Sequence, residues 1–73
     1  MNKAIYSQDH RNLVEKLKQA RIEAGLDQEE AARLLGKTQS YVSKIESGQR
    51  RIDVIQLKNL AKIYEKPFNF FIK

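Results

Sequence analysis

The chain has 73 residues, of which 41% are hydrophobic, and this size and composition predict one small domain with a single core. It carries 14 Lys and Arg residues against 9 acids, for a net charge of +5, which favours polyanionic partners. The absence of cysteine excludes disulfides and thiolate metal sites, and no apolar run approaches the roughly 18 residues of a membrane span. We therefore expect a cytoplasmic protein that is neither exported nor inserted in a membrane.

The first predicted helix runs from about Asp9 to Ala24. Apolar residues recur along it at spacings of four, three and four, which is one stripe of an α-helix. This stripe comprises Leu13, Leu17, Ala20 and Ala24. Gly25 follows at the position where a left-handed residue commonly ends a helix. Residues 1–8 are expected to form an arm or an extra turn, and residues 9–73 the domain itself.

The second and fourth predicted helices begin with the same N-terminal signal. Asp27 and Glu30 have the spacing of a capping box, which Asp53 and Gln56 repeat. Apolar residues at the spacing of a hydrophobic staple flank both boxes, as Leu26 with Ala31 and as Ile52 with Leu57. The predicted inward residues are Ala31, Ala32 and Leu35 in the second helix and Leu57, Leu60, Ala61 and Tyr64 in the fourth.

The third predicted helix extends from Gln39 to about Ser47. Thr38 can cap its start, and Gly48 ends it. Val42 and Ile45 are its expected inward residues.

A fifth short helix is predicted from Pro67 onward. On such a helix the side chains expected to cover the core are Phe68, Phe71 and Ile72. Phe70 is rotated by about 200° from Phe68, and we expect it to be exposed and to mediate homodimerisation. Because no stretch alternates with period two, the predicted fold is an all-α, compact five-helix bundle.

The segment from Gln28 to Glu46 has the pattern of a helix-turn-helix motif. Gly36 can adopt the positive φ that a tight turn needs, and Ala32 allows close approach of two helices. An ordinary helical hairpin would show the same geometry. The residues on the outward face of the third helix therefore distinguish a DNA-binding motif from such a hairpin.

That face favours DNA. Its residues are hydrogen-bonding and none is acidic, namely Gln39, Ser40, Tyr41, Ser43 and Lys44. Gln pairs with adenine and Lys with guanine in the major groove, which is wide enough to admit an α-helix. Backbone amides near Gln28 and Gln39 suit phosphates, and Arg50 and Arg51 could grip the flanking backbone.

From about Leu13 to Ile72, which is more than four-fifths of the chain, the sequence resembles the lambda-repressor-like helix-turn-helix family. The match is carried by the stretch LKQARIEAGLDQEEAARLLGKTQSYVSKIESGQRRIDVIQLKNLAKIY. The residues at the family's spacing are Gln28, Ala32, Gly36, Val42, Ile45, Glu46 and Gly48. The resemblance implies the family's helical fold and binding to double-stranded DNA.

It also implies roles for single residues. Gln28 matches a phosphate-gripping position, and the base-reading positions are Gln39, Ser40 and Lys44. Tyr41 and Ser43 match positions that contact base or backbone, and Ser47, Arg50 and Arg51 fall in the loop that usually touches phosphate. Thr38 is also expected to contact DNA. Lys37 departs from the apolar residue that many members have in this turn, so we expect it to be solvated or near phosphate. Arg21 and Glu46 match a pair of charges that links the first and third helices in several members.

Other chemistry finds little support in the sequence. His10 is the only histidine and is expected to be solvated, so no standard zinc site can form, and we expect no metal, no cofactor and no small-molecule ligand. Glu29 and Glu30 are adjacent on a helix and do not converge as a catalytic pair, so an enzyme is not expected.

Two functions remain. The first is a sequence-specific transcriptional regulator, and the alternative is a protein-interaction or antitoxin module built on the same bundle. The sequence does not choose among phage repressor, restriction-modification controller, antitoxin, or a domain of a longer regulator.

Overall fold

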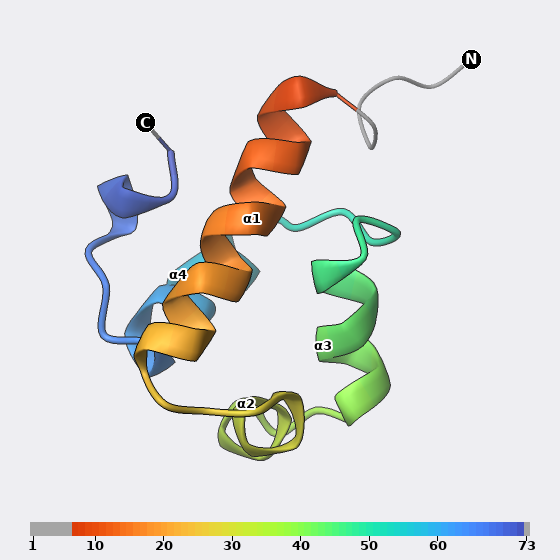
Figure 1. The fold of residues 1–73 in the computed structure, drawn as a ribbon, viewed down its shortest axis with the longest axis vertical. Helices are drawn as coiled ribbons and strands as arrows, with labels where there is room; N and C mark the ends of the chain where they lie inside the picture. The colour runs from red at the N-terminus through yellow and green to blue at the C-terminus, as the bar shows by residue number, and fades with distance from the viewer. Residues whose placement is uncertain (1–6, 73) are drawn as a thin grey trace.

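The structure is a computed structural model that describes residues 7–72 (Figure 1). These residues form four α-helices and one short 3-10 turn. The elements are α1 (Gln8–Glu23), α2 (Gln28–Leu35), α3 (Gln39–Glu46), α4 (Val54–Ile63) and the 3-10 turn η1 (Phe68–Phe70). No strand occurs among these described residues, so the predicted all-α class is confirmed. The predicted count of five α-helices is wrong, because a single 3-10 turn stands where the fifth was expected.

Side chains cap the start of every α-helix. The accepting side chains are those of Ser7, Asp27, Thr38 and Asp53. Both predicted capping boxes are confirmed; in the first, Glu30 N donates to Asp27 Oδ1 at 2.8 Å and Asp27 N donates to Glu30 Oε1 at 2.8 Å. Because Ser7 is the N-cap, α1 begins at Gln8, inside the segment expected as an arm. Residues 1–6 of that expected arm lie outside the described residues.

All four α-helices end in the same way, with a left-handed residue followed by a bond back to the helix. After α2, Lys37 N donates to Ala32 O at 2.9 Å and Gly36 N donates to Arg33 O at 3.1 Å. This pair of bonds is the Schellman motif, which satisfies carbonyls at the helix end. The left-handed residues are Gly25, Gly36, Gly48 and Glu65. The predicted glycine stops are therefore confirmed, and Glu65 is the exception, with a φ of 57°.

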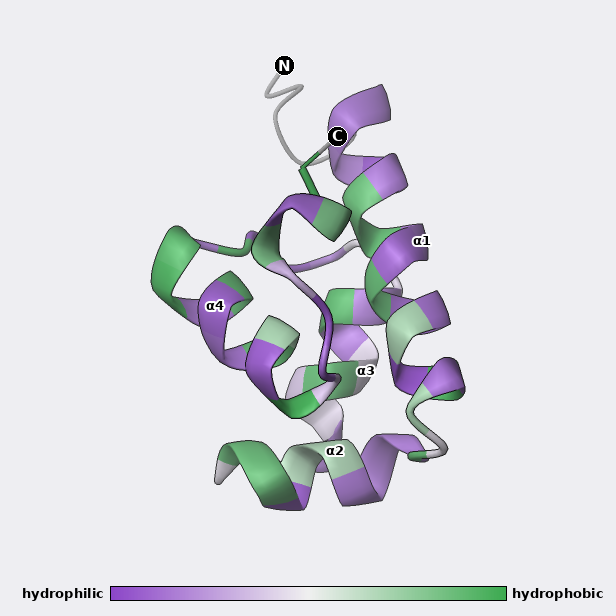
Figure 2. Cartoon of the chain, turned by 90° about the vertical axis from the view of Figure 1, so that its left-hand side faces the viewer, coloured by the Kyte–Doolittle hydropathy of each residue, from purple (hydrophilic) through white to green (hydrophobic). Residues whose placement is uncertain are grey.

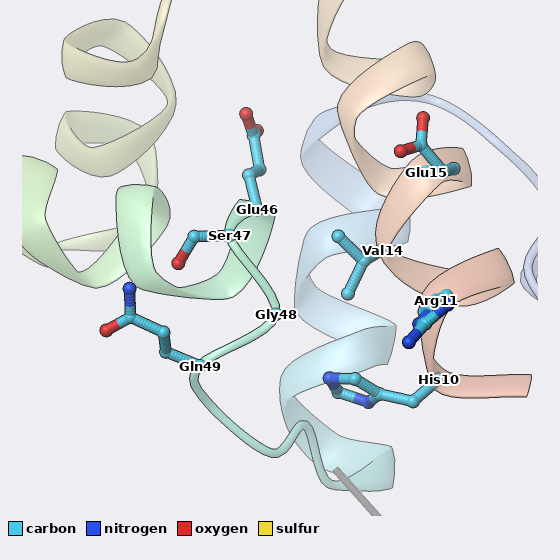
Figure 3. A pocket seen from close by; sticks show the side chains of 8 residues that line it. All are labelled: His10, Arg11, Val14, Glu15, Glu46, Ser47, Gly48 and Gln49. Carbon is cyan, nitrogen blue, oxygen red and sulfur yellow. The ribbon is translucent and has the colours of Figure 1, made fainter. Parts of the chain in front are cut away.

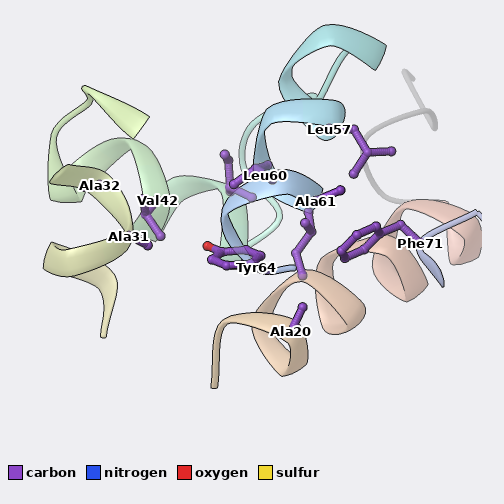
Figure 4. Close-up of a cluster of buried hydrophobic side chains, with 11 residues drawn as sticks. Ala20, Ala31, Ala32, Val42, Leu57, Leu60, Ala61, Tyr64 and Phe71 are labelled. Carbon is purple, nitrogen blue, oxygen red and sulfur yellow. The ribbon is translucent and has the colours of Figure 1, made fainter. Parts of the chain in front are cut away.

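The core lies where the four α-helices and the C-terminal segment meet (Figure 4). The predicted inward residues of α3 and α4 are buried, as are both alanines of α2, while Leu35 is partly buried. Ala20 and Ala31 are completely buried, and their small side chains allow the helices to approach closely.

In α1 the buried stripe differs from the predicted one. Val14 is buried and Ala24 is exposed. Ala24 is the C-cap, beyond the last turn that packs on the core, whereas Val14 lies one turn before Leu17 on the same helix face.

The C-terminal segment also packs differently from the prediction. Phe71 is buried as expected, but Phe68 and Ile72 are exposed, and Phe70 is half-buried against the core. The α-helical periodicity used in the prediction does not apply, because η1 is one 3-10 turn that ends at Phe70. The expectation that Phe70 points away from the core is therefore wrong.

The packing of the helices leaves α3 at an edge of the molecule. α2 packs against α3 and α4, and α1 packs against α3. Figure 1 shows α2 nearly end-on and α3 lengthwise, so their axes cross steeply, as in a helix-turn-helix unit. One long side of α3 faces outward.

Candidate nucleic-acid interface

The outward side of α3 carries polar side chains only. Those of Gln39, Ser40, Ser43 and Lys44 are exposed, whereas Val42 and Ile45 are turned into the core. Tyr41 is half-buried at the margin of this side. The structure therefore brings the expected base-reading residues together on one accessible surface.

Glu46, the one acidic residue of α3, is paired with Arg21 of α1. Arg21 Nε donates to Glu46 Oε2 at 2.7 Å and Nη2 donates to Oε1 at 3.0 Å, a two-pronged arrangement. The side chains are 11% and 5% exposed, and Arg21 Nη1 also donates to Leu26 O at 2.9 Å. The hydrogen bonding of Arg21 to the Glu46 carboxylate is the main cause that raises the pKa of the Arg21 guanidinium. The pair neutralises the negative charge closest to the outward side of α3.

Tyr64, the residue that ends α4 as its C-cap, lies near this ion pair. Its pKa is raised to about 12, mainly by burial; the charge of Glu46 adds to this rise and the charge of Arg21 opposes it. The buried phenol thus joins the electrostatic surroundings of the link between α1 and α3.

Two glutamine side chains extend the ion pair to the surface. Gln28 Nε2 donates to Glu46 Oε1 at 3.1 Å, and Gln39 Nε2 donates to Gln28 Oε1 at 3.4 Å. A chain of hydrogen bonds therefore runs from Arg21 through Glu46 and Gln28 to Gln39. The sequence analysis expected Gln28 at a phosphate and did not find this link, which depends on the approach of α2 to α3.

Basic side chains flank α3 at both ends. Lys37 lies in the turn before it, and Arg50 and Arg51 lie in the loop after it, and all three are exposed. The Lys37 Nζ and Arg50 Cζ atoms lie 5.4 and 4.7 Å from the centroid of the Tyr41 ring. None of these cations, nor Lys44, forms an ion pair with a carboxylate within residues 7–72. This side of the molecule therefore carries uncompensated positive charge.

The remaining expected contact residues, Thr38 and Ser47, serve the ends of α3. Thr38 Oγ1 accepts from Tyr41 N at 3.3 Å, and Ser47 Oγ donates to Lys44 O at 3.1 Å. Both residues are exposed, so these local bonds fix their side chains at the margin of the polar surface.

A separate pocket lies between α1 and the segment that follows α3 (Figure 3). It has a volume of about 240 Å³, and His10 points into it from α1. The His10 Nε2 atom is buried and has no hydrogen-bond partner among the described residues, so the expectation of a solvated histidine is wrong. The part of the chain that the structure describes holds no group of three side chains suited to bind a metal. In the same range, no helix is long and apolar enough to cross a membrane.

Comparison with known families agrees with this geometry. A family model described as "Helix-turn-helix" matches residues 17–71, which include the second half of α1 and all of α2, α3 and α4. A search of curated proteins finds no match. The family match covers more than half of the chain, and the motif it describes coincides with α2, α3 and the turn between them. The chain therefore belongs to the lambda-repressor-like helix-turn-helix family, a family of DNA-binding regulators.

Proposed function

We propose that this chain is a sequence-specific regulator of transcription that binds double-stranded DNA with α3 in the major groove. The observation that carries the proposal is the outward side of α3. Its base-reading side chains are exposed and its one acid is neutralised by Arg21. Around it, Lys37, Arg50 and Arg51 form no ion pair with a carboxylate of residues 7–72. Occupancy of an operator would then block or recruit polymerase, in the cytoplasm of a prokaryotic cell.

The side chains divide into two roles. The proposed base readers are Gln39, Ser40 and Lys44, with Tyr41 and Ser43 at base or backbone. The proposed phosphate contacts are Gln28, Lys37, Thr38, Ser47, Arg50 and Arg51. Gln28 can bind a phosphate without losing its hydrogen bond to Glu46. Its amide nitrogen has two hydrogens, of which one is donated to Glu46 and the other can be donated to a phosphate.

Selection of bound sequences from a random duplex pool tests the proposal. Because one such motif reads only a few base pairs, we expect two inverted half-sites with centres about 34–36 Å apart, bound by a homodimer. Recovery of no preferred sequence, together with no salt-dependent binding to any duplex, would contradict the proposal.

Single substitutions then separate base reading from positioning. Gln39→Ala or Lys44→Ala should cost about 1–3 kcal/mol on the selected site and relax the preference at one or two base pairs. Arg51→Ala should instead weaken binding to all duplexes alike and reduce the slope of log K against log salt by about one. If Gln39→Ala and Arg51→Ala give the same pattern, the division of roles is wrong.

The dimer contact needs a new location, because Phe70 packs on the core. Val54 and Ile55 at the start of α4 are exposed, and Figure 2 shows hydrophobic ribbon at one end of this helix. They directly follow the loop that carries the proposed phosphate contacts Arg50 and Arg51. We propose this pair as the dimer surface.

The same exposed pair is the observation that favours the alternative, a protein-interaction or antitoxin module. Salt dependence distinguishes the two functions. A regulator that contacts several phosphates loses affinity for duplex DNA steeply as salt rises. An interaction module has no such steep dependence on duplex DNA.

A further inference from the structure

A shallow hollow lies over the turn between α2 and α3. Its volume is about 500 Å³, and its lining includes the cations Lys37, Lys44 and Arg50 together with the hydroxyl-bearing residues Thr38 and Ser40. No acidic residue lines it. The three cations come from three different places: the turn before α3, the last turn of α3 and the loop after it.

The aromatic ring of Tyr41 contacts two of these cations, Lys37 and Arg50. Lys37 and Arg50 both lie within the roughly 6 Å at which a cation is attracted to an aromatic face. The Tyr41 ring packs against the core cluster, so its position is set by the fold. One ring thus holds two long, otherwise flexible side chains from opposite ends of α3 at the rim of the same hollow.

Gathering cations in one place is unfavourable unless an anion compensates them. Within residues 7–72 no carboxylate pairs with Lys37 or Arg50, the two cations that the proposed function assigns to phosphate. A phosphate group carries the missing charge and accepts hydrogen bonds from guanidinium, ammonium and hydroxyl groups.

We infer that this hollow binds one phosphate of the DNA backbone, and that Tyr41 is the positioning residue that holds Arg50 and Lys37 toward it. The inference rests on the proposed function and deepens it. Tyr41 thereby acts through its neighbours, because a cation held in place before binding loses less conformational freedom when the phosphate arrives. Each cation–ring attraction at an exposed site corresponds to about two- to fivefold in an equilibrium constant.

A double-mutant cycle on the full chain tests the coupling between Tyr41 and Arg50. The duplex is the one recovered by selection, and affinities are measured for the wild type, Tyr41→Leu, Arg50→Gln and the double variant. We expect Arg50→Gln to weaken binding by about tenfold in the wild type. In the Tyr41→Leu background the same change should cost about two- to fivefold less.

Two controls isolate the ring. Tyr41→Phe retains the aromatic face and should preserve the full effect of Arg50→Gln. Arg51→Gln removes a neighbouring cation that does not contact the ring, so its effect should be equal in both backgrounds. Melting curves confirm that each variant is folded at the assay temperature, and Tyr41→Met replaces Tyr41→Leu if the latter is not.

The inference would be overturned if Arg50→Gln reduced the affinity for DNA equally in the wild type and in Tyr41→Leu. It would also be overturned if Arg50→Gln had a smaller effect on affinity in Tyr41→Phe than in the wild type. Both outcomes leave the proposed function intact, because the wild type still binds the duplex. If the wild type binds no duplex with a salt-dependent affinity, the proposed function itself fails, and the inference fails with it.

Discussion

Arg21 and Glu46 are separated by 25 residues in sequence, yet two hydrogen bonds of 2.7 and 3.0 Å join their side chains and tie α1 to the end of α3. The pair is almost completely enclosed, and Gln28 donates to the same carboxylate. The ion pair therefore supports both the packing of the fold and the orientation of the proposed DNA-reading residues.

Removal of Glu46 should destabilise the protein strongly. Glu46→Ala leaves the Arg21 guanidinium enclosed without its partner, and we expect the free energy of unfolding to fall by about 3–5 kcal/mol in urea denaturation. The matched control is Glu23→Ala, which breaks the surface ion pair with Lys66, whose side chains are 44% and 25% exposed. This control should cost about 1 kcal/mol or less. Equal small losses in the two variants would show that enclosure adds nothing to the Arg21 pair.

Tyr64 should make the protein sensitive to alkaline pH. Its pKa rises from the ordinary 10.0 to about 12 in the folded chain, mainly through burial, so the folded state holds this proton more tightly than the unfolded state. The resulting stability is fully present below pH 10 and declines as the pH rises from 10 to 12. Tyr64→Phe has no proton to lose, so its unfolding free energy should decline less than that of the wild type over this range. Parallel declines in urea denaturation would contradict the assignment.

Glu65 should be a position at which glycine stabilises the chain. It has a φ of 57° at the end of α4, where the other three α-helices have glycine. A left-handed conformation costs a non-glycine residue about 1–2 kcal/mol, partly offset by the greater freedom of glycine in the unfolded chain. Glu65→Gly should therefore raise stability by about 1 kcal/mol, measured as a higher melting temperature.

The converse change tests the same reasoning at Gly36. A Cβ built there meets nothing within 4 Å, so the cost of Gly36→Ala is conformational and does not come from a clash. We expect a loss of about 1 kcal/mol. A Gly36→Ala variant as stable as the wild type, or a Glu65→Gly variant less stable than the wild type, would mean that the left-handed backbone does not control stability at these helix ends.

Substitutions at Phe70 and Ile55 should separate core packing from dimerisation. The Phe70 ring packs edge-on to Phe71 with centroids 5.0 Å apart, and Lys66 lies over it at 4.9 Å. Phe70→Glu should therefore lower stability by about 2 kcal/mol. Ile55 is 65% exposed, so Ile55→Glu should leave the melting temperature unchanged while it shifts sedimentation toward monomer and weakens operator binding. A wild type that stays monomeric when bound to its operator would refute the proposed dimer contact.

The sequence alone was sufficient for the starts of α2, α3 and α4 and for the glycines that end α1, α2 and α3. Capping by Asp27 and Asp53 and termination at Gly36 and Gly48 depend on groups only a few residues apart, so their spacing in the chain is their spacing in space. The inward residues of α3 and α4 follow from the same helical period. The family match over residues 17–71 agrees with the resemblance that these patterns carry.

Only the tertiary structure decided which distant residues meet. The contact between Gln28 and Glu46 and the position of Arg50 on the Tyr41 ring depend on how α2 and the loop after α3 pack. The position of Phe70 also depends on tertiary structure, because its segment forms a single 3-10 turn and the ring packs against the core. Local spacing could not determine these features, since they arise from contacts between segments whose relative positions are set by burial of the shared core.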